Sequence, residues 1–162
     1  MKAFFVFIFL FALNIQAQDL ASFRAKYATA TKSQKNTESY ISFADKVNST
    51  NSVIVGYKAA ALFLKSKLNI EKGKRIEYIK AGVKSLEAEI SDNPNNAELR
   101  MIRLSIQENL PKIVGYGKNI KEDKKFLLDH LKDQPSDLKK YIRNFIAQSK
   151  SFTAQEKTTL KL

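Results

Sequence analysis

Apolar residues recur every three or four positions through most of the chain, and this spacing restricts its fold more than any other feature. The clearest run has intervals of three, four, three and four residues and consists of Ile76, Ile79, Val83, Leu86 and Ile90. Similar spacing marks the segments 20–30, 40–47, 53–68, 99–110 and 126–145. Because a helix turns once every 3.6 residues or so, each segment gains one apolar face. The sequence contains no Asn-Gly or Asp-Gly hairpin turn, and sustained alternation of polar and apolar residues is absent. We therefore predict an all-α protein.

Clusters of Asp, Asn, Ser and Pro precede three of the predicted helices, at residues 48–52, 92–96 and 133–136. Such residues cap helix starts. Asp92 and Asp133 are 41 residues apart, as are Pro94 and Pro135, and the same interval before Asp92 leads to Asn51. Paired-helix units of this length stack into solenoids because a single pair cannot bury its apolar face. We expect antiparallel helix hairpins stacked in this way, with an irregular helical bundle as the alternative.

The stretch Asn-Pro-Asn-Asn-Ala-Glu-Leu-Arg at residues 93–100 resembles the junction between units in tetratricopeptide-like (TPR-like) proteins. In that superfamily a proline ends one unit and the next helix begins. Leu-Pro at residues 110–111 and Gly-Tyr-Lys-Ala-Ala at residues 56–60 add to the likeness, which covers about residues 50–146. The resemblance implies a short TPR-like solenoid that binds a protein or peptide, and it implies nothing about catalysis.

The N-terminus has the pattern of a secretory signal peptide. Lys2 supplies a positive charge, residues 3–13 form an uninterrupted apolar run, and Ile15 and Ala17 occupy the −3 and −1 positions of a cleavage site. Eleven apolar residues are fewer than the roughly 20 that span a bilayer. We expect residues 1–17 to be removed on export, leaving residues 18–162 as a single helical domain in the periplasm or outside the cell. An integral membrane protein is not expected.

The composition narrows the chemistry. The absence of cysteine excludes disulfides, thiol catalysis and thiolate metal sites. The single histidine, His130, has no second ligand at helical spacing, so we predict no metal site and no cofactor. Gly115-Tyr-Gly-Lys118 lacks the spacing of a phosphate-binding loop. With neither a nucleophile with its base nor a cofactor motif, we do not expect an enzyme.

The formal net charge is +12, from 28 Lys and Arg against 16 Asp and Glu. Such a balance favours acidic partners, and export makes nucleic acid the least expected of them. One group of lysines has three-residue spacing at its start and consists of Lys118, Lys121, Lys124 and Lys125. It could bind an anionic surface, but Glu122, Asp123 and Asp129 interrupt it, which is also typical of a solvated helix face.

The best candidate binding residues are Arg100 and Arg103, with Asn96 and Gln107 extending the polar stripe by one turn in each direction. In a solenoid this stripe would line the concave face, where guanidinium groups suit a carboxylate or phosphate. The alternative is that the arginines pair with internal acids such as Glu98 or Glu77 and fix the helix register. We therefore expect an exported, non-enzymatic module that binds a protein or peptide. The alternative function is a cationic envelope-binding protein that attaches to anionic lipid or polysaccharide.

Overall fold

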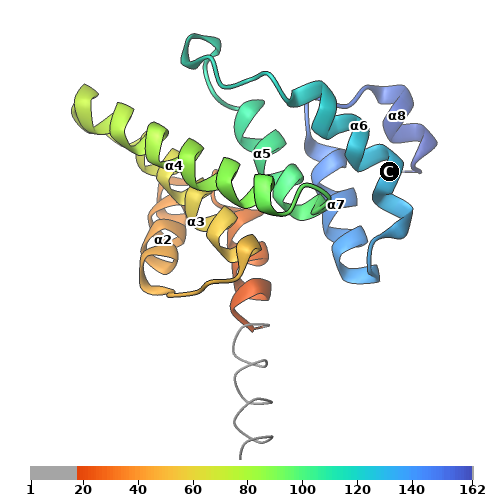
Figure 1. Cartoon of the computed structure of the whole chain (residues 1–162), viewed down its shortest axis with the longest axis horizontal. Coiled ribbons are helices and arrows are strands. Elements are labelled where there is room, and N and C mark those ends of the chain that lie inside the picture. Colours follow the sequence, from red (N-terminus) through yellow and green to blue (C-terminus); the bar gives the residue numbers. More distant parts are fainter. Residues whose placement is uncertain (1–17, 162) are drawn as a thin grey trace, which may run out of the picture. The chain divides into compact units, whose positions relative to one another are not determined.

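The computed structural model describes residues 18–161, and the regular elements in that range are all helical (Figure 1). The described residues begin with a helical segment at residues 18–27, and the elements that follow are α2 (Gln34–Lys46), α3 (Ser52–Lys65), α4 (Lys72–Asp92), α5 (Ala97–Gln107), η1 (Lys112–Val114), α6 (Ile120–His130), η2 (Leu131–Asp133), α7 (Ser136–Gln148) and α8 (Ala154–Thr159). The all-α prediction is confirmed. The predicted signal peptide, residues 1–17, lies outside the described residues. Within residues 18–161, no helix has the length and apolar character needed to cross a membrane.

The described chain divides into two compact units. Unit 1 reaches to Ser85 and unit 2 begins at Leu86, so the division falls inside α4. The expectation that residues 18–162 form a single domain stays a prediction.

Unit 1 is built around three aromatic side chains. Phe23, Tyr40 and Tyr57 are completely buried, and the rings of Phe23 and Tyr57 stack with centroids 5.7 Å apart. The Tyr40 hydroxyl donates a hydrogen bond to the backbone oxygen of Tyr57 at 2.7 Å, which joins α2 to α3. Gly82 of α4 faces Phe63 of α3 so closely that a Cβ built on it would lie 2.8 Å from the ring. The missing side chain therefore allows α4 to approach α3.

Unit 2 is organised around α5, which packs chiefly on α6 and also contacts α7. Its most deeply buried apolar side chains come from every one of these helices and from the end of α4: Leu86, Leu99, Met101, Ile102, Leu104, Leu127, Ile142 and Ile146. The last described helix, α8, begins with a capping box. The Thr153 hydroxyl accepts from the Glu156 N–H at 3.2 Å, and the Glu156 carboxylate accepts from the Thr153 N–H at 2.7 Å.

The predicted turn clusters precede helix starts. Asn51 and Asn96 cap α3 and α5 in the same manner, since each side chain accepts from two backbone N–H groups of the first turn. Pro135 stands before α7 and makes no such bond. The three helices begin at residues 52, 97 and 136, so the interval falls from 45 to 39 residues instead of holding at 41.

Candidate functional site

All four predicted binding residues lie along α5, the most enclosed helix of unit 2. Asn96 is its N-cap, with its side-chain oxygen accepting from the N–H groups of Glu98 and Leu99 at 3.1 Å. Arg103 is only 4% exposed, and Gln107 is equally buried. The expected concave stripe is therefore directed largely into the protein interior. Asn96 acts locally on its own helix, whereas the other three residues face neighbouring elements.

Arg103 forms a two-pronged ion pair with Asp123 of α6. Its Nε donates to Oδ2 and its Nη2 donates to Oδ1, both at 2.7 Å, while Asp123 is completely buried. The third guanidinium nitrogen, Nη1, donates to Glu87 of α4 at 2.9 Å. Burial by itself would lower the pKa of Arg103, but its hydrogen bonds and the charges of Asp123 and Glu87 outweigh this and raise it. The guanidinium cation of Arg103 therefore links α5 to both α6 and α4.

Arg100 lies one turn earlier and completes the cluster. Its Nη1 donates to Glu122 at 2.7 Å and to Asp123 at 3.0 Å, and its Nε donates to the backbone oxygen of Pro94 at 2.7 Å. The guanidinium carbon lies 4.4 Å from the centroid of the Phe126 ring, a cation–π geometry. The hydrogen bond from Arg100 lowers the pKa of the Glu122 carboxyl, and a second bond from Asn119 adds to this effect.

Glu87 ties the loop before α6 to the same cluster. Its Oε2 accepts from Arg103 and its Oε1 accepts from the hydroxyl of Tyr116. Burial raises the pKa of the Tyr116 phenol well above its ordinary value, and the hydrogen bond to Glu87 raises it further. The phenol is therefore a fixed donor. We call the six side chains of this assembly the ion cluster: Glu87, Arg100, Arg103, Tyr116, Glu122 and Asp123.

The arginines thus pair with internal acids, which are Asp123, Glu87 and Glu122 rather than Glu98 or Glu77. The sequence holds a signal for the most important of these. Asp123, Leu127 and Leu131 are spaced by four residues and all three are buried on one side of α6 and η2. An acid in register with an apolar stripe indicates a buried partner for a cation. Interpreted only as an acid that interrupts the lysine series, Asp123 does not predict the ion cluster.

Gln107 is the predicted residue that has a buried polar atom without a hydrogen-bond partner among the described residues. Its Nε2 donates to Asn119 at 3.4 Å, and its Oε1 is a buried acceptor without a hydrogen-bond partner in the described part of the chain.

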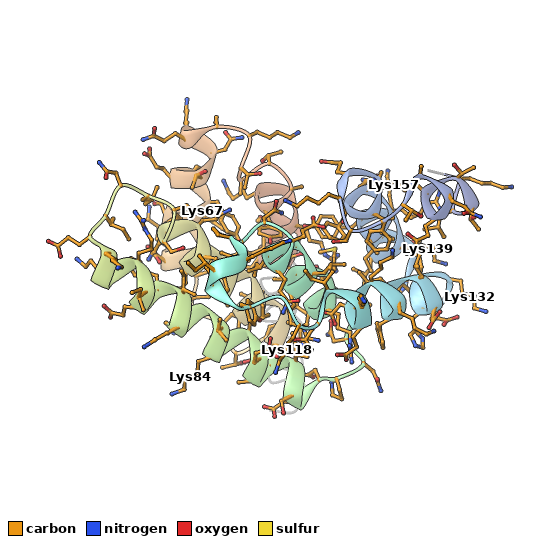
Figure 2. All side chains as sticks on the ribbon, turned by 90° about the horizontal axis from the view of Figure 1, so that it is seen from above. Lys67, Lys84, Lys118, Lys132, Lys139 and Lys157 are labelled. Carbon is orange, nitrogen blue, oxygen red and sulfur yellow. The ribbon has the colours of Figure 1, made fainter. Side chains whose placement is uncertain are left out.

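The lysine series divides in two. Lys124 pairs with Glu156 and Lys125 with Asp129, whereas the side chains of Lys118 and Lys121 are exposed before them. Figure 2 labels Lys118 beside the loop that leads into α6.

The ion cluster can hold helices together, because its two cations and three carboxylates satisfy one another across α4, α5 and α6. The residues that the structure describes do not bring together three His, Asp or Glu side chains that could hold a metal ion. His130 lies at the exposed end of α6, with its Nδ1 3.6 Å from a carboxylate oxygen of Asp133.

Comparison with known proteins adds no relative: no protein-family model, no curated protein and no solved structure matches this chain.

Proposed function

We propose that this protein is an exported, non-enzymatic helical-repeat protein that acts as an interaction module for a protein or peptide. Export rests on the charged, apolar and small-residue pattern of residues 1–17. The TPR-like arrangement rests on the packing of α2 on α3 and of α5 on α6, and on the matching asparagine caps of α3 and α5. Uneven intervals between the helix starts are compatible with a short, irregular version of such a repeat.

The observation that carries the proposal is a hollow in unit 1. It has a volume of about 260 Å³, and its walls come from α2, α3, the turn between them and α4. Five of the lining residues are apolar, namely Ala44, Val55, Ala59, Ala61 and Leu62, and four are polar or charged, namely Asp45, Ser49, Lys58 and Ser85. A hollow that combines apolar side chains with a few polar groups suits the anchoring side chain of a peptide.

Charge indicates which peptides the hollow suits. Residues 18–85 carry 13 Lys and Arg against 5 Asp and Glu, so unit 1 holds most of the excess positive charge. At the hollow, Asp45 is already paired with Lys65 at 2.8 Å, while Lys58 donates to the backbone oxygen of Val47. We therefore expect an acidic peptide that places one apolar side chain among Val55, Ala59 and Leu62.

A selection from a displayed peptide library tests this function. The wild-type protein should select peptides that combine an apolar anchor with neighbouring acidic residues. Ser85→Phe fills the hollow and should abolish the selection, whereas Ser39→Phe, at an exposed position of α2, should leave it unchanged. Leu62→Ala enlarges the hollow and should shift the selected anchor to a larger side chain. Peptides that bind wild type, Ser85→Phe and Leu62→Ala equally would contradict the proposal.

A further inference from the structure

The loop between α5 and α6 presents the most exposed large apolar side chain among the described residues. Ile113 is 95% exposed, and the next is Ile76 at 43%. Ile113 is the middle residue of η1, a single turn closed by hydrogen bonds from the N–H of Val114 to Pro111 and from the N–H of Gly115 to Lys112, both at 3.0 Å. In Figure 1 the loop extends beyond the end of α5. Ile113 is therefore displayed at the tip of a structured turn.

Both sides of this tip are fixed. Pro111 restricts the backbone on entry. On exit, Gly115 adopts φ 71°, a left-handed conformation that glycine takes without strain. One residue later the hydroxyl of Tyr116 is bonded to Glu87 of the ion cluster. The ion cluster thus holds the base of the loop in place, and the side chain of Ile113 at the tip stays exposed.

The loop is also electropositive. Between Asn109 and Lys121 the chain contains three lysines, Lys112, Lys118 and Lys121, and no acidic residue. All three are exposed. The acids at either end are engaged elsewhere: Glu108 accepts hydrogen bonds from the hydroxyls of Ser149 and Ser151, and Glu122 accepts from Arg100 and Asn119. The exposed apolar tip therefore belongs to a segment that carries three exposed lysines and no acidic residue.

We infer that this loop is a contact element for an anionic lipid bilayer, with Ile113 entering the boundary between headgroups and acyl chains. Lysines beside the tip would bind anionic headgroups while their methylene stems lie along the apolar boundary. Shallow insertion of apolar residues next to basic ones is how proteins attach to one leaflet without crossing it. A protein partner is the weaker fit, because a protein interface needs an apolar core, and Ile113 is the single exposed large apolar side chain that the described residues of this loop offer. The inference goes beyond the proposed peptide module and rests on different residues.

A tryptophan reporter tests the inference directly, since the chain has no tryptophan of its own. Ile113→Trp in the full chain is mixed with vesicles of phosphatidylcholine containing increasing phosphatidylglycerol. The emission of this tryptophan should shift to shorter wavelength on anionic vesicles and be quenched by brominated acyl chains. Asn144→Trp, at an exposed position of α7, should do neither. Equal responses from the two reporters, or no response from the first, would overturn the inference.

Vesicle co-sedimentation supplies the second measurement. Ile113→Ser should weaken binding to anionic vesicles about tenfold, since it removes one apolar side chain from the contact. Lys112→Gln with Lys118→Gln should weaken it further and reduce its dependence on salt. The apolar run of residues 3–13 is common to all variants, so it cannot produce these differences. Unchanged vesicle binding by Ile113→Ser would overturn the inference. So would an emission shift of the Ile113→Trp reporter that appears only when a protein, and not a vesicle, is added.

Discussion

The carboxylate of Asp123 holds two arginines at once, and it has no exposed surface of its own. Removing it would leave Arg103 buried with only Glu87 as a partner. Breaking a buried ion pair from one side costs about 3–5 kcal/mol, because the remaining charge has no compensation. We predict that Asp123→Ala lowers the free energy of unfolding by an amount in this range, measured by urea denaturation.

Glu122 provides the matched control for this prediction. It also pairs with Arg100, but 56% of its side chain is exposed, so water can replace it. Exposed pairs contribute at most about 1 kcal/mol, and Glu122→Gln should fall within that limit. If both variants lose the same amount of unfolding free energy, the ion pairs of Asp123 are no more buried than that of Glu122, and the prediction is wrong. Replacing both Arg103 and Asp123 by apolar residues should restore part of the stability.

The contribution of Tyr116 to the free energy of unfolding should depend on pH. Its pKa in the folded protein is raised above the ordinary value of 10.0, so folding favours the protonated phenol. Its contribution to stability is fully present below pH 10 and is lost as pH rises above it, because the unfolded chain then releases the proton. The difference in unfolding free energy between wild type and Tyr116→Phe should therefore narrow above about pH 10. Denaturation at several pH values measures it, and a constant difference would contradict the raised pKa.

The sequence predicts which residues of α5 are polar but not what they bind. Arg100 and Arg103 stand three residues apart, and this indicates a shared direction on the helix. Their partners come from α6 and from the end of α4, at distances of 16 to 23 residues along the chain. No local pattern specifies such pairing. The four-residue spacing of Asp123 with two buried leucines is the signal that comes nearest to doing so.

Helix α4 contains two glycines with opposite surroundings, and they offer a test of its packing. A Cβ on Gly82 would lie 2.8 Å from the Phe63 ring and 3.2 Å from the backbone oxygen of Ala59. A Cβ on Gly73 would have nothing within 4 Å. Alanine favours a helix over glycine by up to about 1 kcal/mol. Gly73→Ala should therefore raise the unfolding free energy by up to that amount.

Gly82→Ala should lower stability despite the same gain in helix propensity, since Phe63 or the backbone of α3 must move. A loss of about 1–3 kcal/mol is expected from overpacking. Thermal or urea denaturation of the two variants measures the contrast. Stabilisation by both substitutions would mean that α4 does not pack closely on α3 at this position.

Helix positions could be predicted well because each helix carries its own signal. The spacing of Ile76, Ile79, Val83, Leu86 and Ile90 lies within α4, and the asparagines that cap α3 and α5 stand where N-cap chemistry requires them. Helix packing could not be predicted, because Gly82 looks like any other glycine until Phe63 is placed against it. For the same reason the hairpin arrangement within a solenoid stays a proposal.

The boundary between unit 1 and unit 2 lies within one continuous helix, so it could not be predicted from the sequence. Residues 72–92 form an unbroken α4, so no loop or change of composition marks Ser85 and Leu86 as a boundary. The division reflects where each part of the helix finds its buried neighbours. Gly82 lies against α3, whereas Glu87 is bonded to α5 and to the loop that follows it.

Because the chain divides into two units, we predict that a destabilising substitution in one unit speeds amide hydrogen exchange in that unit alone. Free energies of opening differ between regions that have separate buried contacts. Asp123→Ala should speed amide hydrogen exchange around Ile102, Leu127 and Ile142 and leave the exchange around Tyr40 and Tyr57 unchanged. Gly82→Ala should do the reverse. Exchange measured by mass spectrometry on peptides from each unit, under conditions where both variants remain folded, separates the two effects. If either variant speeds exchange equally in both units, the chain opens as one cooperative body and the two units are not energetically distinct.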